Sequence, residues 1–124
     1  NIVSSTYKGN ATGANAYKAQ TINGITFTVY EDKTVKVNGT STAQTDLLIG
    51  EPNLVNGTSY ILNGCPAGGS ASSYHLMMKR FASNNPYDSG SGLTFTPEAS
   101  DTYRQVILRV QSGQTINNLI FKFT

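Results

Sequence analysis

The sequence contains no tryptophan, a single cysteine, Cys65, and a single histidine, His75. One cysteine excludes an internal disulfide, and one cysteine with one histidine argues against zinc, which takes about four such ligands in structural sites. The missing tryptophan removes the Cys, Trp, Cys hallmark of immunoglobulin domains, so an immunoglobulin-like sandwich is only the second choice of fold. No His or basic residue flanks Cys65 to stabilise a thiolate. We therefore expect Cys65 to be a small buried or half-buried residue at a turn.

Charge is also scarce, since 13% of the 124 residues are charged and the net charge is +2. The basic residues are scattered, and Lys79 with Arg80 is the only adjacent pair. We therefore expect no nucleic acid and no anionic membrane among the partners. No apolar run approaches the roughly 20 residues that cross a bilayer.

What the sequence has in abundance is period-two alternation. Ile25, Phe27 and Val29 alternate with polar residues, as in a strand with one buried face. No segment has the apolar repeat of a helix, and no strand is followed by the dozen or more residues that a parallel crossover needs. The further expected strands cover residues 34–38, 45–50, 58–63, 73–81, 93–97 and 103–111, and a last strand points Leu119, Phe121 and Phe123 inward. Asn38-Gly39 and Asn56-Gly57 are interpreted as tight turns.

These segments predict an all-β fold, an antiparallel two-sheet β-sandwich with jelly-roll topology and about eight strands. Residues 1–20, which show neither period, are expected to be an N-terminal arm or leading strand, and residues 21–124 a single jelly-roll domain. The jelly-roll rule orders the eight strands as one-eight-three-six and two-seven-four-five. Because the chain lacks an initiator Met and stops inside a strand pattern, we expect it to belong to a longer polypeptide or a larger assembly.

On this pairing, the outward residues of the second sheet combine apolar or aromatic area with hydrogen-bond donors. They are Lys36, Ser59, Ile61, His75, Met77, Lys79, Tyr103, Gln105, Ile107 and Arg109. A pyranose has an apolar C–H face that stacks on Tyr or His and a rim of hydroxyls, so this mixture predicts carbohydrate binding. The alternatives are an ordinary solvated face, with His75 exposed, or an apolar patch of Ile61, Met77 and Ile107 covered by residues 1–20 or a neighbouring subunit.

Nothing in the sequence indicates an enzyme. His75 has no carboxylate within several positions, as a nucleophilic triad would need, and no pair of the acidic residues is spaced as in a glycosidase. The Gly-rich residues 64–72 lack the Lys of a phosphate-binding loop and are interpreted as a flexible turn. We expect no cofactor. Turn carboxylates leave a structural calcium site open, although no loop signature marks one.

One family resemblance adds to these inferences. Its most specific part is Gly64-Cys65-Pro66-Ala67-Gly68-Gly69-Ser70, followed by Ser73-Tyr74-His75-Leu76 and by Tyr87-Asp88-Ser89-Gly90-Ser91-Gly92-Leu93-Thr94-Phe95. These motifs, within residues 21–124, resemble a domain of structural proteins from phages of Gram-positive gut bacteria, which is itself similar to carbohydrate-binding jelly rolls. The resemblance implies a non-enzymatic tail, fibre or capsid-associated module, located on the virion or a cell surface. Its partners would be host-surface glycan or neighbouring virion subunits, including copies of itself.

Three functions therefore stand as hypotheses. The first is a phage virion module that binds host carbohydrate. The second is a structural or decoration domain whose outer sheet face mediates protein assembly. The third is the carbohydrate-binding module of a secreted bacterial glycoside hydrolase.

Overall fold

The structure, a computed structural model, describes residues 19–30 and 34–122, and this part of the chain contains only strands, turns and loops. Its strands are β1 (Ala19–Ile22), β2 (Ile25–Val29), β3 (Thr34–Thr40), β4 (Thr45–Gly50), β5 (Tyr60–Leu62), β6 (Tyr74–Lys79), β7 (Tyr87–Asp88), β8 (Leu93–Phe95), β9 (Gln105–Val110) and β10 (Thr115–Lys122). Every pairing between them is antiparallel. No helix in these residues could cross a membrane. The predicted all-β, antiparallel sandwich class is confirmed.

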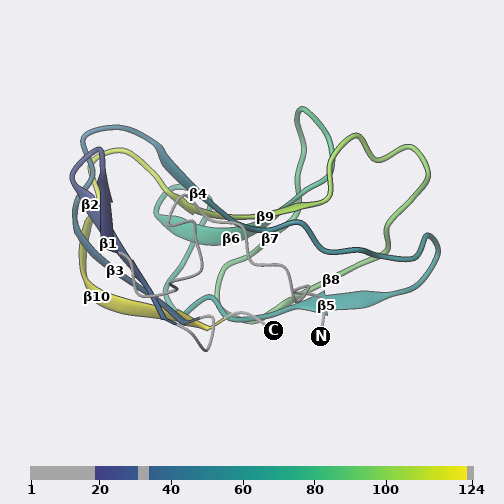
Figure 1. The fold of residues 1–124 in the computed structure, drawn as a ribbon, viewed down its shortest axis with the longest axis horizontal. Coiled ribbons are helices and arrows are strands. Elements are labelled where there is room, and N and C mark those ends of the chain that lie inside the picture. The colour runs from purple at the N-terminus through teal and green to yellow at the C-terminus, as the bar shows by residue number, and fades with distance from the viewer. Residues whose placement is uncertain (1–18, 31–33, 123–124) are drawn as a thin grey trace.

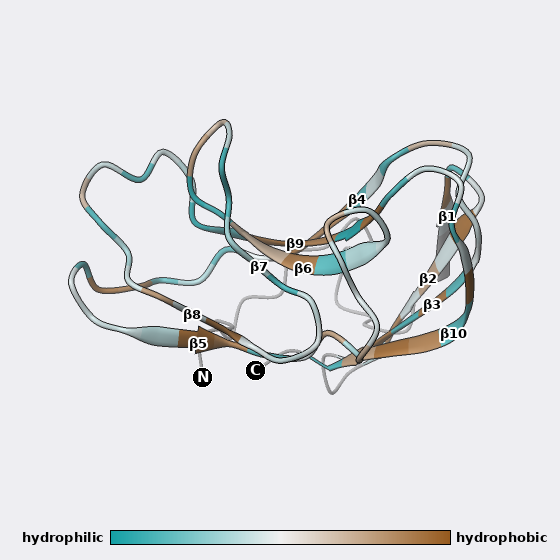
Figure 2. Cartoon of the chain, turned by 180° about the vertical axis from the view of Figure 1, so that it is seen from behind, coloured by the Kyte–Doolittle hydropathy of each residue, from teal (hydrophilic) through white to brown (hydrophobic). Residues whose placement is uncertain are grey.

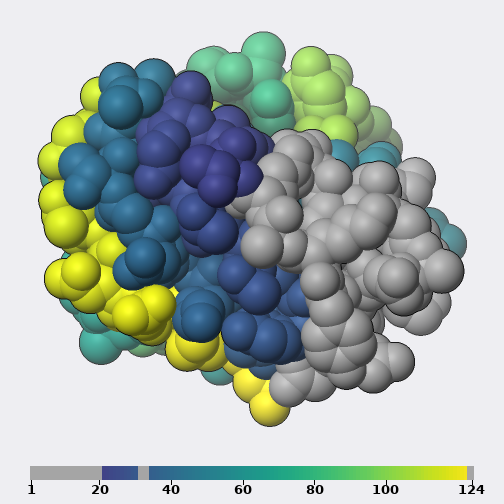
Figure 3. Space-filling model, turned by 60° about the vertical axis from the view of Figure 1, so that its left-hand side comes forward, coloured from purple at the N-terminus to yellow at the C-terminus, as the bar shows by residue number. Residues whose placement is uncertain are grey.

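The strands form two four-stranded sheets, in the orders β1-β2-β3-β10 and β4-β9-β6-β7, and a two-stranded ladder of β5 and β8. In Figure 1 the β4-β9-β6-β7 sheet forms an upper layer, and β10 and the β5-β8 ladder lie below it. Tyr74 of β6 meets Phe121 of β10 edge to face across this space, with ring centroids 5.7 Å apart. Figure 3 brings the left-hand side of Figure 1 toward the viewer, and there β1, β2 and β3 adjoin the yellow β10.

The core lies between the layers and follows the predicted alternation. Figure 2 shows hydrophobic colour concentrated on strands and most connecting loops hydrophilic. The largest fully buried side chains come from both layers and from β5: Ile25, Phe27, Val29, Val35, Val37, Leu47, Ile49, Leu62, Leu76, Met78, Leu108 and Phe121. Burying such side chains removes apolar area from water, which is the main stabilising force for a sandwich of this kind.

The jelly-roll pairing order is not confirmed. Among the described strands, none of the six neighbour pairs expected from that rule occurs. The strand at 25–29 pairs instead with the next strand, β3, and β5 pairs only with β8. A short connection between β2 and β3 favours this outcome, since consecutive strands joined by a few residues usually pair as a hairpin.

Of the two predicted Asn-Gly turns, Asn56-Gly57 is confirmed, and the N–H of Thr58 donates to the carbonyl oxygen of Val55 across it. A further Asn-Gly turn occurs at residues 23 and 24. Asn23 and Gly24, with φ of 50° and 85°, form the two-residue turn between the paired residues Ile22 and Ile25, the conformation that a type I′ hairpin requires. Asn38 and Gly39 lie inside β3, so the turn predicted there is wrong. A Cβ on Gly39 would lie 2.2 Å from the carbonyl oxygen of Gly24. Because Gly39 has no Cβ, the backbone of the β1–β2 hairpin at Gly24 can pack closely against β3.

The proposed arm and domain boundary fall partly outside the described residues. Residues 1–18 lie outside them, as does Phe123 of the last strand. Residues 19 and 20 belong to β1, whose Ala19 is paired with Thr28 of β2. The boundary expected after residue 20 thus falls within a strand of the first sheet.

Candidate binding groove

The pairing of β6 with β9 builds the centre of the candidate site. Its register places His75 opposite Arg109, Met77 opposite Ile107 and Lys79 opposite Gln105. Alternate residues of a strand point to opposite faces of the sheet, and the residues between these belong to the core. The six side chains therefore share the outer face, as the sequence predicted for these two strands.

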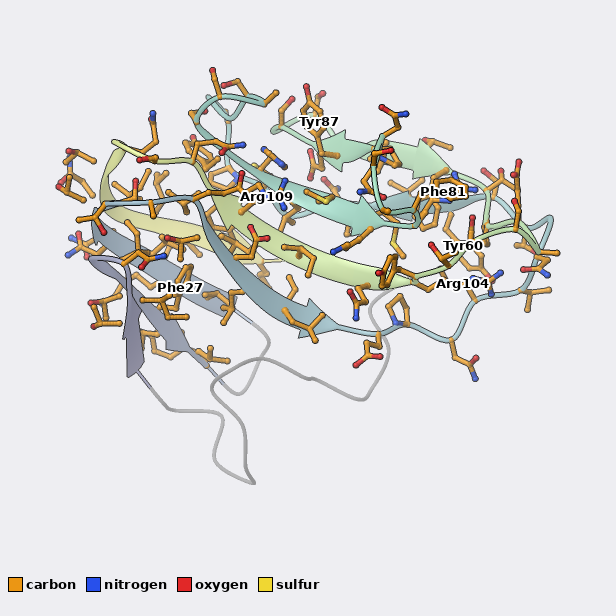
Figure 4. The ribbon with its side chains drawn as sticks, turned by 90° about the horizontal axis from the view of Figure 1, so that it is seen from above. Phe27, Tyr60, Phe81, Tyr87, Arg104 and Arg109 are labelled. Atoms are coloured by element: carbon orange, nitrogen blue, oxygen red, sulfur yellow. The ribbon has the colours of Figure 1, made fainter. Side chains whose placement is uncertain are left out.

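A groove of about 350 Å³ lies on this outer face. From β6 it is lined by His75, Met77 and Lys79, and from β9 and the residue after it by Arg109 and Gln111. Residues 82–85, Tyr87 of β7 and Ala71 complete its lining. Figure 4 looks down on this sheet, with Tyr87 and Arg109 labelled on β7 and β9.

His75 is only 3% exposed, which corrects the expectation of an exposed sheet residue. Its Nδ1 lies 3.0 Å from the carbonyl oxygen of Ser70, and its ring lies against that of Tyr87 with centroids 4.7 Å apart. A carbonyl can only accept, so Nδ1 carries the proton and donates it. The Nε2 atom is then an acceptor, and it has no partner among the described residues.

Burial is the largest cause of a lowered pKa for His75, because an apolar environment disfavours the charged ring. The positive charge of Arg109 lowers the pKa further, while the Ser70 carbonyl and the charge of Asp46 oppose the shift. The ordinary pKa is 6.5, so a lowered value keeps His75 neutral at neutral pH. A neutral imidazole therefore belongs to the lining of the groove.

Arg109 is held by Asp46, its cross-strand neighbour on β4. The Nε of Arg109 donates to one carboxylate oxygen at 2.7 Å, and an Nη donates to the other at 2.9 Å. This two-point contact fixes the plane of the guanidinium, as arginine–carboxylate pairs do. Asp46 therefore orients a cation that lines the groove.

Lys79 has a different partner. Its amine lies 4.8 Å from the centroid of the Tyr103 ring, a cation–π contact, and it forms no ion pair within the described part of the chain. Tyr103 itself lies in the loop before β9 and is 40% exposed. An aromatic ring attracts the ammonium without cancelling its charge, so Lys79 brings a net positive charge to the groove.

Of the predicted binding residues, Tyr103 and Gln105 do not line the groove, and three others lie away from β6 and β9. Lys36 is on β3 of the other four-stranded sheet, opposite Thr28 and Ile120. Ser59 immediately precedes β5, and Ile61 lies on β5, which pairs with β8 and with no other strand of the described residues. The pairing order decides this difference, because the prediction had joined all of these strands in one sheet.

Ile61, Met77 and Ile107 do not form the exposed apolar patch that the sequence predicted. Ile61 is 59% exposed but sits on the separate ladder, whereas Met77 and Ile107 are 5% and 7% exposed. The outer face of β6 and β9 is therefore already covered over its apolar centre. Met77 is also one of the residues that line the groove, whereas Ile107 is not.

Sequence reasoning missed Tyr87 and Gln111 of the groove and the supporting residue Asp46. Gln111 had a signal, since it continues the outward alternation of Gln105, Ile107 and Arg109. Tyr87 had none, because β7 has only two residues inside a predicted loop. Asp46 becomes a partner of Arg109 only once β4 and β9 are paired.

Residues 64–70 contact β6 and β7, two of the strands that line the groove. Asp88 is fully buried, and its carboxylate accepts the N–H of Cys65 at 3.1 Å and those of Gly90 and Gly92 at 2.8 Å each. A Cβ on Gly69 would lie 2.6 Å from the carbonyl oxygen of Tyr74. This segment is tightly packed, whereas the sequence predicted a flexible turn. It holds Ser70, whose carbonyl orients His75.

Cys65 is buried at the start of this segment, as predicted. Burial, followed by the nearby charge of Asp88, raises the pKa of its thiol to about 12. The thiol therefore stays protonated at neutral pH and is a poor nucleophile. Within residues 19–30 and 34–122, no group of three or more His, Cys, Asp or Glu side chains is placed to hold a metal ion.

Comparisons with models of known protein families, with curated proteins and with solved structures find no match for this chain.

Proposed function

We propose that this chain is a non-enzymatic module that binds carbohydrate in the groove over β6 and β9. One observation carries the proposal: aromatic and apolar surface from Tyr87, His75 and Met77 lines the same groove as the donors of Lys79, Arg109 and Gln111. The volume of about 350 Å³ lies within the range of small-ligand sites.

The chemistry of a sugar suits both parts of this lining. Tyr87 is 39% exposed, so its ring has area left for the C–H face of a pyranose. Sugar hydroxyls both donate and accept. The Nε2 of His75 would accept from one hydroxyl, and the Arg109 and Gln111 side chains would donate to others.

In this proposal the module belongs to a phage virion or to another surface-displayed protein, and its ligand is a host-surface glycan. The resemblance of residues 57–95 to phage structural domains supports that setting. The groove supports the binding role independently of the setting, because it depends only on the residues that line it.

A glycan array tests the proposal by comparing the unmodified protein with two variants of Tyr87. Tyr87→Ala removes the ring and should weaken binding by about tenfold, a typical effect of losing one aromatic contact. Tyr87→Phe keeps the ring and should retain binding. Ile61→Ala, a change to an exposed residue on β5 away from the groove, is the matched control.

Two results would contradict the proposal. One is unchanged glycan binding by a folded Tyr87→Ala protein, which would move the site away from the groove. The other is the absence of any glycan signal from a protein that elutes as a stable trimer or larger, which would favour the assembly role.

A further inference from the structure

We propose that the groove selects acidic glycans, in which an anionic carboxylate or phosphate group contacts Lys79 and Arg109 while a sugar hydroxyl donates to His75. This inference deepens the proposed function and depends on it. It concerns the class of carbohydrate, which the aromatic and apolar lining alone does not specify.

The first observation is the charge of the lining. Two cationic side chains, Lys79 and Arg109, line the groove, and none of the Asp or Glu side chains in residues 19–30 and 34–122 does. The whole chain has nine basic and seven acidic residues, so its charge is otherwise nearly balanced. A concave site with one sign of charge attracts a ligand of the opposite sign.

The second observation is that the charge of Lys79 is not compensated. Among the described residues its amine meets only the ring of Tyr103, at 4.8 Å from the centroid. Lys79 is itself one of the residues that line the groove. A ligand anion would supply the negative charge that the protein does not.

The third observation is the remaining capacity of Arg109. Its contact with Asp46 occupies two N–H groups of the guanidinium, out of the five that an arginine carries. The other N–H groups have no acceptor in the described part of the chain. Asp46 fixes the orientation of the Arg109 guanidinium, so its remaining N–H groups can donate to an anionic or hydroxyl oxygen of a ligand without reorienting.

The fourth observation distinguishes a sugar from a simple anion. His75 is 3% exposed, its Nδ1 is engaged by Ser70, and its Nε2 is an acceptor without a partner among the described residues. An unpaired acceptor in a buried side chain is costly, and a ligand that donates a hydrogen bond relieves that cost. A fully ionised inorganic anion has no hydrogen to donate, whereas a sugar acid does.

The test compares three soluble polymers of similar length by isothermal titration calorimetry. They are a polyuronate, a sugar-phosphate polymer and the neutral polymer dextran. We expect at least one of the two acidic polymers to bind about tenfold more tightly than dextran, the size of one charge-assisted hydrogen bond. The acidic polymer that binds identifies carboxylate or phosphate as the anionic group. Its affinity should fall with added salt, because the cations are partly exposed.

Substitution of one lysine gives the decisive comparison. Lys79→Gln should weaken binding of the acidic polymer by about tenfold. It should weaken binding of dextran by less, because Gln keeps a hydrogen-bond donor and loses only the charge. Lys36→Gln removes the same charge from β3 of the other sheet and should change neither. An equal loss in both variants would show a non-specific effect of net charge and overturn the inference.

The remaining outcomes distinguish failure of the selectivity for acidic glycans from failure of carbohydrate binding itself. Equal binding of acidic and neutral polymers would overturn acidic selectivity and leave carbohydrate binding intact. No binding of any polymer, together with an empty glycan array, would instead overturn the proposed function. Inorganic sulfate is fully ionised and has no hydrogen to donate, so sulfate that competes as well as the polymer would refute the part assigned to the His75 acceptor.

Discussion

The two four-stranded sheets share the same sequence alternation but differ on their outer faces. In β2 and β3 the core residues alternate with outward residues such as Thr26, Thr28 and Lys36, which are half-buried. In β6 the outward residues His75 and Met77 are as buried as their inward neighbours. The outer face of the first sheet is therefore an ordinary solvated face, whereas that of the second is covered over His75, Met77 and Ile107.

The cover over β6 and β9 comes in part from loops that the strands themselves anchor. Ser70 contacts His75 from the segment before β6, Tyr87 contacts it from β7, and Tyr103 meets Lys79 from the loop before β9. Long loops usually carry function on a rigid scaffold. The two sheets therefore differ because loops pack against the outer face of β6 and β9. These two strands form the floor of the groove, and residues 82–85 and Ala71 from the loops complete its lining.

The largest expected loss of stability follows removal of the Asp88 carboxylate, which binds the loops beside β6 and β7. Asp88→Ala should lower the free energy of unfolding by about 3 to 5 kcal/mol, because the N–H groups of Cys65, Gly90 and Gly92 lose their buried acceptor. Urea denaturation measures the loss. Asp46→Ala is the control: its side chain is 38% exposed, and an exposed pair contributes about 1 kcal/mol or less. Similar losses in the two variants would contradict this assignment.

Two adjacent methionines on β6 test the comparison directly, since Met78 faces the core and Met77 faces outward. Met78→Ala should cost about 2 to 5 kcal/mol, as buried methionines do. Met77→Ala should cost about 1 to 3 kcal/mol, because it is 5% exposed but lies beside an open groove.

Thr28→Ala, on the outward side of β2, provides the reference for the solvated sheet and should change stability by only about 0.5 kcal/mol. Thermal and urea unfolding of the three variants measure the differences. If Met77→Ala is as mild as Thr28→Ala, the outer face of β6 is not a second apolar layer and the comparison fails.

The smallest expected effect is on pH dependence. The pKa of His75 is lowered from 6.5 in the folded protein, mainly by burial. As pH falls from 7 to 5, the unfolded chain takes up this proton before the folded one, so the free energy of unfolding falls. His75→Gln should flatten the profile in this window.

Asp101 does not interfere with this measurement. Burial alone would raise its pKa, but hydrogen bonds from Arg80 and Glu98 and the charges of Arg80 and Arg104 outweigh burial and lower the pKa below its ordinary 3.8. Its contribution to stability is present above that pH and is lost only below it. Parallel profiles for the protein and His75→Gln between pH 7 and 5 would contradict the burial of a neutral imidazole.

The alternation predicted most of the strands and which face each residue occupies. The outward set of β6 and β9 came from this pattern alone, as did the inward Leu76 and Leu108. The same pattern does not say which strand lies beside which, and so Lys36 and Ile61 were assigned to the wrong sheet. The pattern does not predict the strand of Tyr87, because that strand depends on pairing with β6 and on the hydrogen bond between Asp88 and Cys65. Both contacts join residues that are distant in the sequence.

By itself the amino-acid sequence determined an antiparallel β-sandwich and the direction of its side chains, because a strand turns alternate residues to opposite faces wherever it lies. Only the tertiary structure decided which strands are neighbours, which outward residues are covered and where the groove opens. Strand pairing and the contacts of Ser70, Tyr87 and Asp46 join residues far apart in the chain, and their order depends on the packing of all the strands at once.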